Sequence, residues 1–220
     1  MYFPLLNYHT SRTFAIAFIV EGDCEYDCFP GFVSKILGYE TSLPIANARG
    51  IGNIVNNLDE LLLLLVKSNK PKKIIITLDL KDALEQRMAR NCIELKEKVE
   101  NSAQRWLRNQ EFGSLVESLP HEVVVVIADK TYDAWLCSDV EGLKRCPLIN
   151  PSKITSAYSN VDCEIPNPII WLKDKCISNI DLKSRRHRKE IAKSINPSIG
   201  KDHSRSFRKF YKEVINCRIY

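Results

Sequence analysis

The first 130 residues of the chain contain three long apolar runs: TFAIAFIV at 13–20, KKIIITLDL at 72–80 and EVVVVIADK at 122–130. Their nearly continuous Val, Ile and Leu content is typical of β-strands that are covered on both faces. A shorter strand is expected at 41–46, just before the glycine turn ARGIGN.

The segments between these runs have the apolar spacing of helices. Residues 25–37 place large apolar side chains on one helical face, and Gly38 is a suitable stop. A second helix is predicted over 53–67 and a long polar one over 82–108. Alternation of strands and helices predicts an α/β fold, with a mostly parallel, Rossmann-like central sheet flanked by crossover helices.

The amino-acid composition of the chain changes after residue 146. Pro147, Pro151, Pro166 and Pro168 lie among many Asn and Ser residues, which favours loops and turns. Two basic segments follow, near 181–194 and 203–216. We therefore predict a core at 1–146 and a loop-rich, basic helical C-terminal appendage at 147–220 that packs on the core.

Composition narrows the class of protein. The longest purely apolar run, residues 61–66, is far too short to span a membrane, and the N-terminus has no secretory pattern. We expect a cytoplasmic protein with no membrane partner. The eight Cys residues form no CxxC pair and the four His residues are scattered, which favours free thiols and argues against a zinc site.

Acidic residues follow the predicted strands. Glu21 ends the first, Asp79 the third, and Asp129 follows the fourth, with Asp82 and Asp133 shortly after. Ligands of open α/β sheets bind beyond the carboxyl ends of the strands, so these carboxylates would converge on one cleft. Such a cluster is costly unless protons or cations neutralise it, and Mg²⁺ prefers oxygen ligands and phosphate-bearing substrates.

The other acids near the first strand allow two interpretations of their role. Glu25 lies four residues after Glu21, so both could face the cleft from one side of a helix. Asp23 and Asp27 are better explained as acids that complement the positive end of that helix, and Asp82 could serve its own helix in the same way.

Four segments of the chain, in this order, resemble the landmarks of a known family: FIVEGDCEYDCF, IIITLDLKD, IADKTYDAWLCSD and DHSRSFRKFYKEV. The family is the TOPRIM-like group of small bacterial proteins that are often encoded beside an AAA or ABC-type ATPase in abortive-infection and other anti-phage systems. The wider superfamily includes topoisomerases, primases and the overcoming-lysogenization-defect nucleases. There a strand-ending Glu acts in acid/base chemistry and a DxD motif binds magnesium.

The resemblance implies roles for four residues. Glu21 takes the acid/base position, Asp79 the first metal-binding position, and Glu25 the second acid of the nuclease pattern EGxxE. Asp133 occupies the acid position of the family's EAWL-like segment, here DAWL.

The chain departs from the family at Lys81, which stands where DxD has its second acid, while Asp82 comes one place later. Either Asp82 serves as the ligand or the site has lost its ability to bind the metal ion. In a third reading, Lys81 neutralises part of the acidic cluster or contacts phosphate, which would make the site a binder.

Basic charge is concentrated at the C-terminal end. Residues 173–220 hold 14 Lys and Arg against 5 Asp and Glu, although the whole chain has a net charge of only +5. Such charge can neutralise nucleic-acid phosphates, and binding to an acidic partner subunit would use the same side chains. Phe207 and Phe210 fit core anchors better than base-stacking platforms. The candidate nucleic-acid-binding residues are Arg185, Arg186, Arg188, Lys189, Arg205 and Arg208.

These observations predict a Mg²⁺- or Mn²⁺-dependent nuclease, cutting DNA or RNA by the two-metal mode, as the effector of an anti-phage complex with an ATPase. The first alternative is a catalytically degenerate module that binds nucleic acid or the ATPase, and a less favoured one is a primase-type nucleotidyl transferase. The candidate catalytic residues are Glu21, Glu25 and Asp79. The candidate metal ligands are Glu21, Glu25, Asp79, Asp82 and Asp133.

Overall fold

A four-stranded parallel sheet forms the centre of the computed structural model, which describes residues 15–108 and 119–219. Its strands are β1 (Ile16–Val20), β2 (Ile45–Asn47), β3 (Lys73–Asp79) and β4 (Glu122–Ala128), in the spatial order β2-β1-β3-β4. Every neighbouring pair is parallel. The predicted α/β fold with a mostly parallel sheet is confirmed, and the part of the first predicted strand at 13–14 lies outside the described residues.

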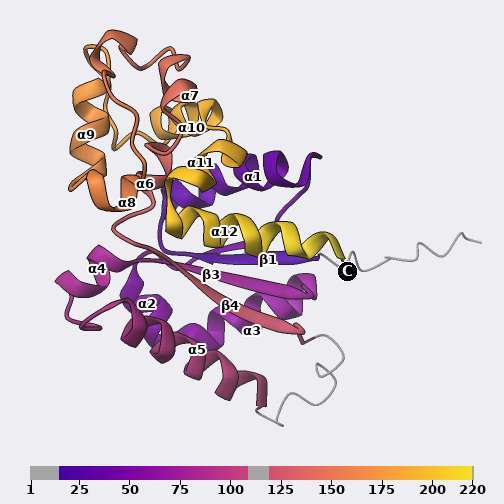
Figure 1. Cartoon of the computed structure of the whole chain (residues 1–220). Coiled ribbons are helices and arrows are strands. Elements are labelled where there is room, and N and C mark those ends of the chain that lie inside the picture. Colours follow the sequence, from indigo (N-terminus) through magenta and orange to yellow (C-terminus); the bar gives the residue numbers. More distant parts are fainter. Residues whose placement is uncertain (1–14, 109–118, 220) are drawn as a thin grey trace, which may run out of the picture.

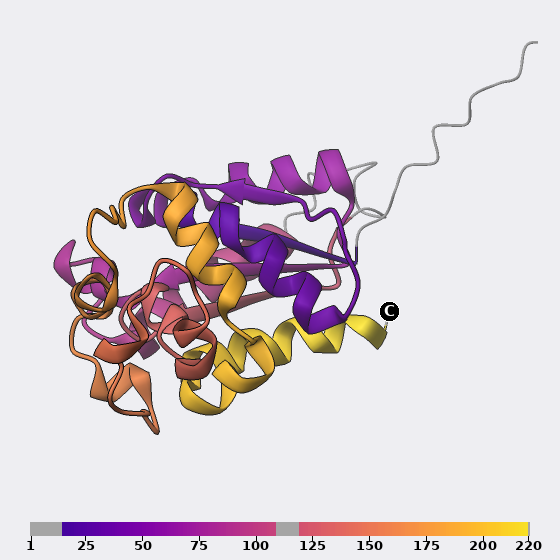
Figure 2. The same ribbon diagram turned by 90° about the horizontal axis from the view of Figure 1, so that it is seen from above.

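The sheet is covered on both faces (Figure 1). One face carries α2 (Ile51–Asn56), α3 (Leu58–Asn69) and α5 (Cys92–Arg108), with α4 (Leu80–Glu85) at its edge. The other face carries α1 (Asp23–Leu37), α10 (Arg185–Ser194) and α12 (Arg205–Ile215), and Figure 2 shows α1 and α10 side by side. Each face has its own hydrophobic cluster, as expected for strands that are buried on both sides.

The strands that follow β1 in the sequence lie on its two sides in the sheet. The chain passes from β1 through α1 to β2, which lies on one side of β1. It then passes through α3, on the opposite face of the sheet, to β3, which lies on the other side of β1. The order therefore reverses between β1 and β3, and the loops that follow these strands diverge there. Such a reversal opens a crevice at the carboxyl edge of the sheet.

Most of the remaining elements cluster above the carboxyl edge and around α1 (Figure 1). They are α6 (Asp133–Leu136), α7 (Val140–Lys144), α8 (Val161–Glu164), α9 (Pro168–Lys175), α11 (Pro197–His203) and the short 3₁₀ helix η2 (Pro151–Lys153). The 3₁₀ helix η3 (Asn216–Ile219) directly follows α12 and lies at the opposite, amino end of the strands.

The C-terminal part shares the core of the sheet. Phe207 and Phe210 of α12 are fully buried, as predicted, and the ring centroid of Phe210 lies 5.9 Å from that of Phe18 in β1. The hydrophobic cluster on this face continues from Leu143 to Ile149. The boundary predicted at residue 146 stays a prediction.

Two predicted helices are each divided in the structure. The segment 53–67 forms α2 and α3, which meet at Asn57. The segment 82–108 forms α4 and α5, because the chain turns at Arg87, whose φ is 56°. The N-terminus of α5 is secured by Glu94, whose N–H donates to Asn91 Oδ1 at 2.9 Å and whose side chain accepts from Arg90 N at 2.7 Å.

The helix predicted at 25–37 begins two residues earlier, at Asp23, and ends at Gly38, whose φ of 80° favours glycine. All eight cysteines are free thiols. In residues 15–108 and 119–219, no helix has both the length and the apolar character needed to cross a membrane.

Candidate active site

A cavity of about 640 Å³ opens at the carboxyl edge of the sheet, between the ends of β1 and β3 and the loop after β2. One part of its wall is acidic and another part is basic. Its lining residues are Glu21, Gly22, Asp23, Cys24, Glu25, Asn47, Arg49, Gly50, Asp79, Asp82, Arg185 and Arg188.

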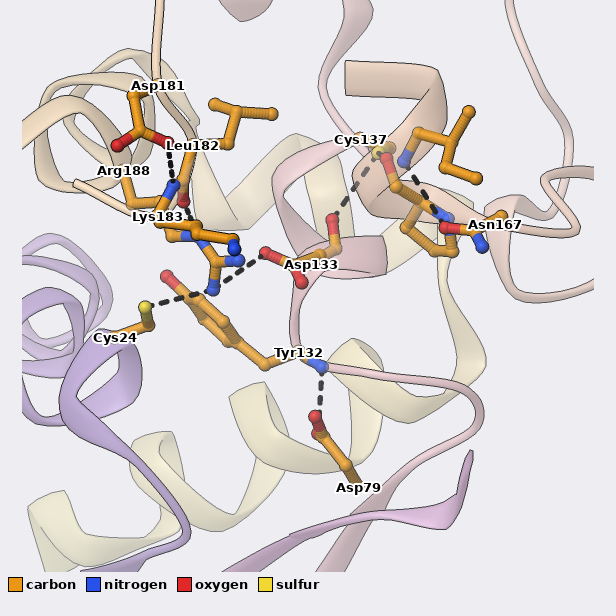
Figure 3. A network of polar contacts seen from close by, with 12 residues as sticks. Cys24, Asp79, Tyr132, Asp133, Cys137, Asn167, Asp181, Leu182, Lys183 and Arg188 are labelled. Atoms are coloured by element: carbon orange, nitrogen blue, oxygen red, sulfur yellow. Dashed lines mark hydrogen bonds and ion pairs between the residues drawn. The ribbon is translucent and has the colours of Figure 1, made fainter. Parts of the chain in front are cut away.

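Glu21 and Asp79 lie together at this edge because their strands are neighbours in register. Glu21 follows the last residue of β1 and is only 6% exposed. Its Oε2 accepts a hydrogen bond from Asp79 N at 3.0 Å, and Asp79 Oδ1 accepts one from Tyr132 N at 2.8 Å (Figure 3). The backbone at the end of β3 thus connects the first acid to the loop after β4.

Glu25 reaches the same cavity from the first turn of α1 and is 7% exposed. Gly22 makes room for it, because a Cβ at residue 22 would lie 3.3 Å from Glu25 Oε2. The glycine of the EG pair therefore allows the carboxylate of Glu25 to come close to the strand end.

Asp133, at the start of α6, adds a buried carboxylate from the loop after β4. Its Oδ1 lies 3.3 Å from Arg188 Nη1 but accepts no hydrogen bond. Arg188 also donates from Nη1 to Cys24 Sγ at 2.9 Å and from Nε to the Leu182 carbonyl at 2.5 Å (Figure 3). The guanidinium is thereby held between α1, α6 and the loop that precedes α10.

The carboxyl groups of the cavity resist ionisation. Burial, and then the charge of Asp82 and a hydrogen bond with it, raise the pKa of Glu21 to about 8, although the Asp79 N–H opposes the shift. Burial, followed by the charge of Asp133, raises the pKa of Glu25 to about 7. Burial and the charges of Glu25 and Glu21 raise the pKa of Asp79 well above its usual range. At neutral pH the cluster therefore favours a bound proton or cation.

Asp82 turns into the cavity, where it interacts with Glu21. The side chain of Lys81 is 46% exposed, and its Nζ lies 3.7 Å from Glu85 Oε1. Burial raises the pKa of Asp133, which the charge of Arg188 and, to a smaller extent, that of Lys81 oppose. Of the two residues, Asp82 is the one that lines the cavity with the other acids.

The predicted nucleic-acid-binding residues occupy different positions. Arg185 pairs with Asp27 through two hydrogen bonds of 2.5 and 2.8 Å, and Arg188 is held as described above, so both turn toward the cavity and its rim. Arg186 and Lys189 are exposed on α10. Arg205 and Arg208 are exposed on α12, where Arg208 donates to the carbonyls of Lys201 and Asp202.

Sequence reasoning missed Arg49, an exposed residue in the loop after β2 that lines the cavity. Its φ is 58°, and Gly50 beside it has a φ of 121°. The loop is held by Gly50 N, which donates to the Glu21 carbonyl at 2.7 Å, and by Arg49 N, which donates to Asn47 Oδ1 at 2.9 Å. The available signal was the turn ARGIGN at the end of a predicted strand, since ligands bind at strand ends.

The residues present suit a divalent cation. The pKa values of Glu21 and Glu25, which line the cavity, are raised, and a bound cation would lower them. Asp133 adds a buried oxygen that accepts no hydrogen bond, although this oxygen lies 3.3 Å from Arg188 Nη1 and Asp133 is not among the residues that line the cavity. Within the described part of the chain, no three His, Cys, Asp or Glu side chains are already placed to hold a metal ion. Mg²⁺ needs no such preformed cage, because it usually binds one or two carboxylates together with water and substrate phosphate.

Comparisons with known proteins give a fold-level likeness only. No family model and no curated protein matches the chain. Two structures of the C-terminal region of the Xanthomonas campestris pv. campestris OLD protein, phased with platinum and with mercury, are similar to it at 14% identity. They cover 92% of this chain and 93% and 95% of their own, with TM-scores of 0.39 and 0.41. These scores are too low for any role to be transferred to this chain.

Proposed function

We propose that the chain is a TOPRIM-like nuclease that uses Mg²⁺ or Mn²⁺ to hydrolyse phosphodiester bonds of DNA or RNA. The main support is the convergence of Glu21, Asp79 and Asp82 in one cavity at the carboxyl edge of the sheet. A divalent ion bound there supplies charge neutralisation on the phosphate and makes a bound water more acidic.

Each acid has its own part in the proposal. Asp79 and Asp82, which line the cavity, would hold the cation, and Asp133, which is not among the lining residues, would add negative charge from the loop after β4. Without a cation the pKa of Glu21 is about 8, and a cation bound beside it would lower that pKa, so Glu21 can then accept a proton from a water at neutral pH. Its Oε2 stays fixed for that task through the hydrogen bond from Asp79 N.

The arginines suit the phosphate. The side chain of Arg188 is 18% exposed and is oriented by the Leu182 carbonyl, while Arg49 is exposed in the loop after β2 and lines the same cavity. Guanidinium groups pair well with phosphate oxygens. A phosphodiester placed between the acidic and the basic parts of the wall would thus have a positive partner on both sides once a cation is bound.

The resemblance in the sequence also supports a place in an anti-phage complex with an AAA or ABC-type ATPase. The partner follows from the resemblance alone, and co-purification of the chain with the ATPase encoded beside it would test this part of the proposal.

A second candidate function, a module that binds nucleic acid or the ATPase without catalysis, is favoured by Lys81. This residue brings a positive charge to the position where the family pattern has an acid, and that charge opposes a cation near Asp133. A primase-type transferase would use the same carboxylates and is distinguished by the need for nucleotides.

The decisive experiment is cleavage of labelled DNA and RNA by the purified chain with Mg²⁺ or Mn²⁺, alone and with the ATPase. Glu21→Gln and Asp79→Asn should each abolish cleavage, because they remove a charge while keeping shape. Glu100→Gln on α5 is the control and should cleave as wild type does, since α5 packs on the face of the sheet opposite to α1 and α10. Undiminished cleavage by either site variant would rule out the assignment.

A further inference from the structure

A second cavity adjoins the acidic one. It has a volume of about 440 Å³ and lies between α9 and the loop that precedes α10. Arg188 lines both cavities, so they meet at its side chain. The residues lining the second cavity are Ile169, Ile170, Lys173, Ile180, Asp181, Leu182, Lys183 and Arg188.

The boundary between the cavities is preformed. Arg188 Nε donates to the Leu182 carbonyl at 2.5 Å, while its Nη1 reaches Cys24 and Asp133 on the other side. Figure 3 shows Asp181, Leu182 and Lys183 grouped on one side of Arg188, with Asp133 and Cys24 on the other. A ligand that extends past Arg188 from the acids would enter the second cavity directly.

The wall of the second cavity combines an apolar surface with positive charge. Four aliphatic side chains, those of Ile169, Ile170, Ile180 and Leu182, line it together with Lys173 and Lys183. The single acid, Asp181, is engaged in the turn, since its Oδ1 accepts from Lys183 N at 2.8 Å.

This chemistry suits a nucleotide. A nucleobase has apolar faces that can lie against aliphatic side chains, and its phosphate would pair with lysine or arginine. A volume of about 440 Å³ is within the range of small-molecule sites. A base can enter such a concave site only when it is outside the duplex stack.

We infer that this second cavity binds an unpaired nucleotide of the substrate, adjacent to the phosphate held in the acidic cavity. The inference rests on the proposed function and specifies its substrate class as single-stranded nucleic acid, or a duplex with an unpaired flap or end. The base packs between α9 and the 180–183 loop, and Lys183 and Lys173 bind the flanking phosphate. Arg188 lies between this nucleotide and the phosphate in the acidic cavity.

The test measures binding without catalysis. Fluorescence anisotropy with labelled oligonucleotides of about 12 nucleotides, single-stranded and duplex, is recorded in EDTA so that no cleavage occurs. Ile170→Glu and Lys183→Glu should each weaken single-strand binding by about tenfold, because one loses the apolar contact and the other reverses a phosphate partner. Duplex binding should change by less than about twofold in the same variants.

Matched controls separate this cavity from general surface effects. Ile177→Glu changes another exposed isoleucine just beyond α9, and Lys67→Glu reverses a lysine on α3, which covers the opposite face of the sheet. Both controls should bind single strands as wild type does. Ile170 is 64% exposed, so Ile170→Glu should keep the wild-type midpoint of thermal unfolding, which is measured alongside.

A second measurement assigns the base itself. An abasic nucleotide is moved stepwise along the oligonucleotide, and one position should weaken wild-type binding by about tenfold while having no effect on Ile170→Glu. Wild-type affinity in Ile170→Glu, an equal loss in the control variants, or binding of duplex alone would overturn the inference. So would a wild-type chain that binds no nucleic acid, which would leave the cavity to a peptide of a protein partner.

The two proposals fail differently. A wild type that binds single strands through Ile170 and Lys183 but never cleaves would overturn the nuclease and retain the nucleotide site. A wild type that cleaves, with Ile170→Glu binding and cleaving equally well, would retain the nuclease and overturn the nucleotide site.

Discussion

Asp162 in α8 and Asp133 at the start of α6 are both buried carboxylates, 2% and 7% exposed, yet their surroundings are opposite. Asp162 accepts hydrogen bonds from Ser204 Oγ at 2.9 and 3.0 Å and from Ser206 N at 3.0 Å. Asp133 has an oxygen that accepts none, although Arg188 Nη1 lies 3.3 Å from it, and it has the acid Asp82 as a neighbour.

The difference separates structural from functional acids. The network of Asp162 extends to Trp135, whose Nε1 donates to Ser206 Oγ at 2.8 Å, and it joins α8 to the start of α12. Hydrogen-bonded in this way, a buried carboxylate stabilises the fold. The acids beside Asp133 repel one another instead, and such repulsion persists in a protein where a ligand relieves it.

The largest effect is expected when the satisfied carboxylate is removed. Asp162→Ala leaves the donors of Ser204 and Ser206 unpaired, so it should lower the free energy of unfolding by about 3 kcal/mol. Glu21→Gln should leave it unchanged or raise it, because the amide oxygen can still accept from Asp79 N while a repelling charge is lost. Urea unfolding followed by Trp fluorescence compares the two, and equal destabilisation would contradict the distinction.

Much of the fold could be predicted from the sequence. The strands were recognisable because their Val and Ile runs are nearly continuous, and the acids at their ends followed from chain order. The spatial order β2-β1-β3-β4 was not predicted, because it depends on which crossovers form. Asn91 and Glu94, an Asn-x-x-Glu pattern typical of a helix start, could have indicated where α5 begins.

The site was only partly accessible from the sequence. Glu21, Glu25, Asp79 and Asp82 do line one cavity, but their roles as catalytic groups or metal ligands stay predictions. Arg188 appeared to be one of many basic residues near the C-terminus. Its position against Cys24 and Asp133 depends on the packing of α10 beside α1, which no local pattern reveals.

A smaller effect is expected from pH in the absence of divalent ions. The pKa of Glu21 rises from 4.5 to about 8 and that of Glu25 to about 7, so the folded chain binds more protons than the unfolded chain between about pH 4.5 and 8. Stability should therefore fall as pH rises through this window and level off above it. Thermal unfolding in EDTA from pH 5 to 9 measures the slope.

Glu21→Gln provides the control for this slope. The variant lacks a carboxyl group whose pKa is about 8 in the folded chain, so its unfolding midpoint should fall less steeply with pH than that of wild type. The difference in slope should correspond to the binding of up to about one proton. Identical slopes in wild type and Glu21→Gln would show that the acids of the cavity are not coupled to folding. The carboxyl groups of the cavity would then no longer differ from Asp162 in their electrostatic contribution to stability.

The smallest effect concerns Lys81, whose replacement distinguishes the enzyme from the binding module. Its side chain is 46% exposed, so its repulsion of a cation is screened, and Lys81→Asp should raise Mg²⁺ affinity only about threefold to tenfold. Asp82→Asn should lower the affinity, because Asp82 lines the cavity beside Glu21. Lys67→Asp on α3 is the charge-matched control and should leave it unchanged.

The affinity is read from the rise in unfolding midpoint during a Mg²⁺ titration at pH 8, which needs no cleavage. If wild type already responds to Mg²⁺ and Asp82→Asn does not, Asp82 has taken the place of the missing acid and the nuclease is supported. If only Lys81→Asp responds, the natural cavity repels the cation and the chain is the binding module. Equal responses of Lys81→Asp and Lys67→Asp would mean that Lys81 acts on the cavity no more than a distant surface charge does, and its contribution at Asp133 would be negligible.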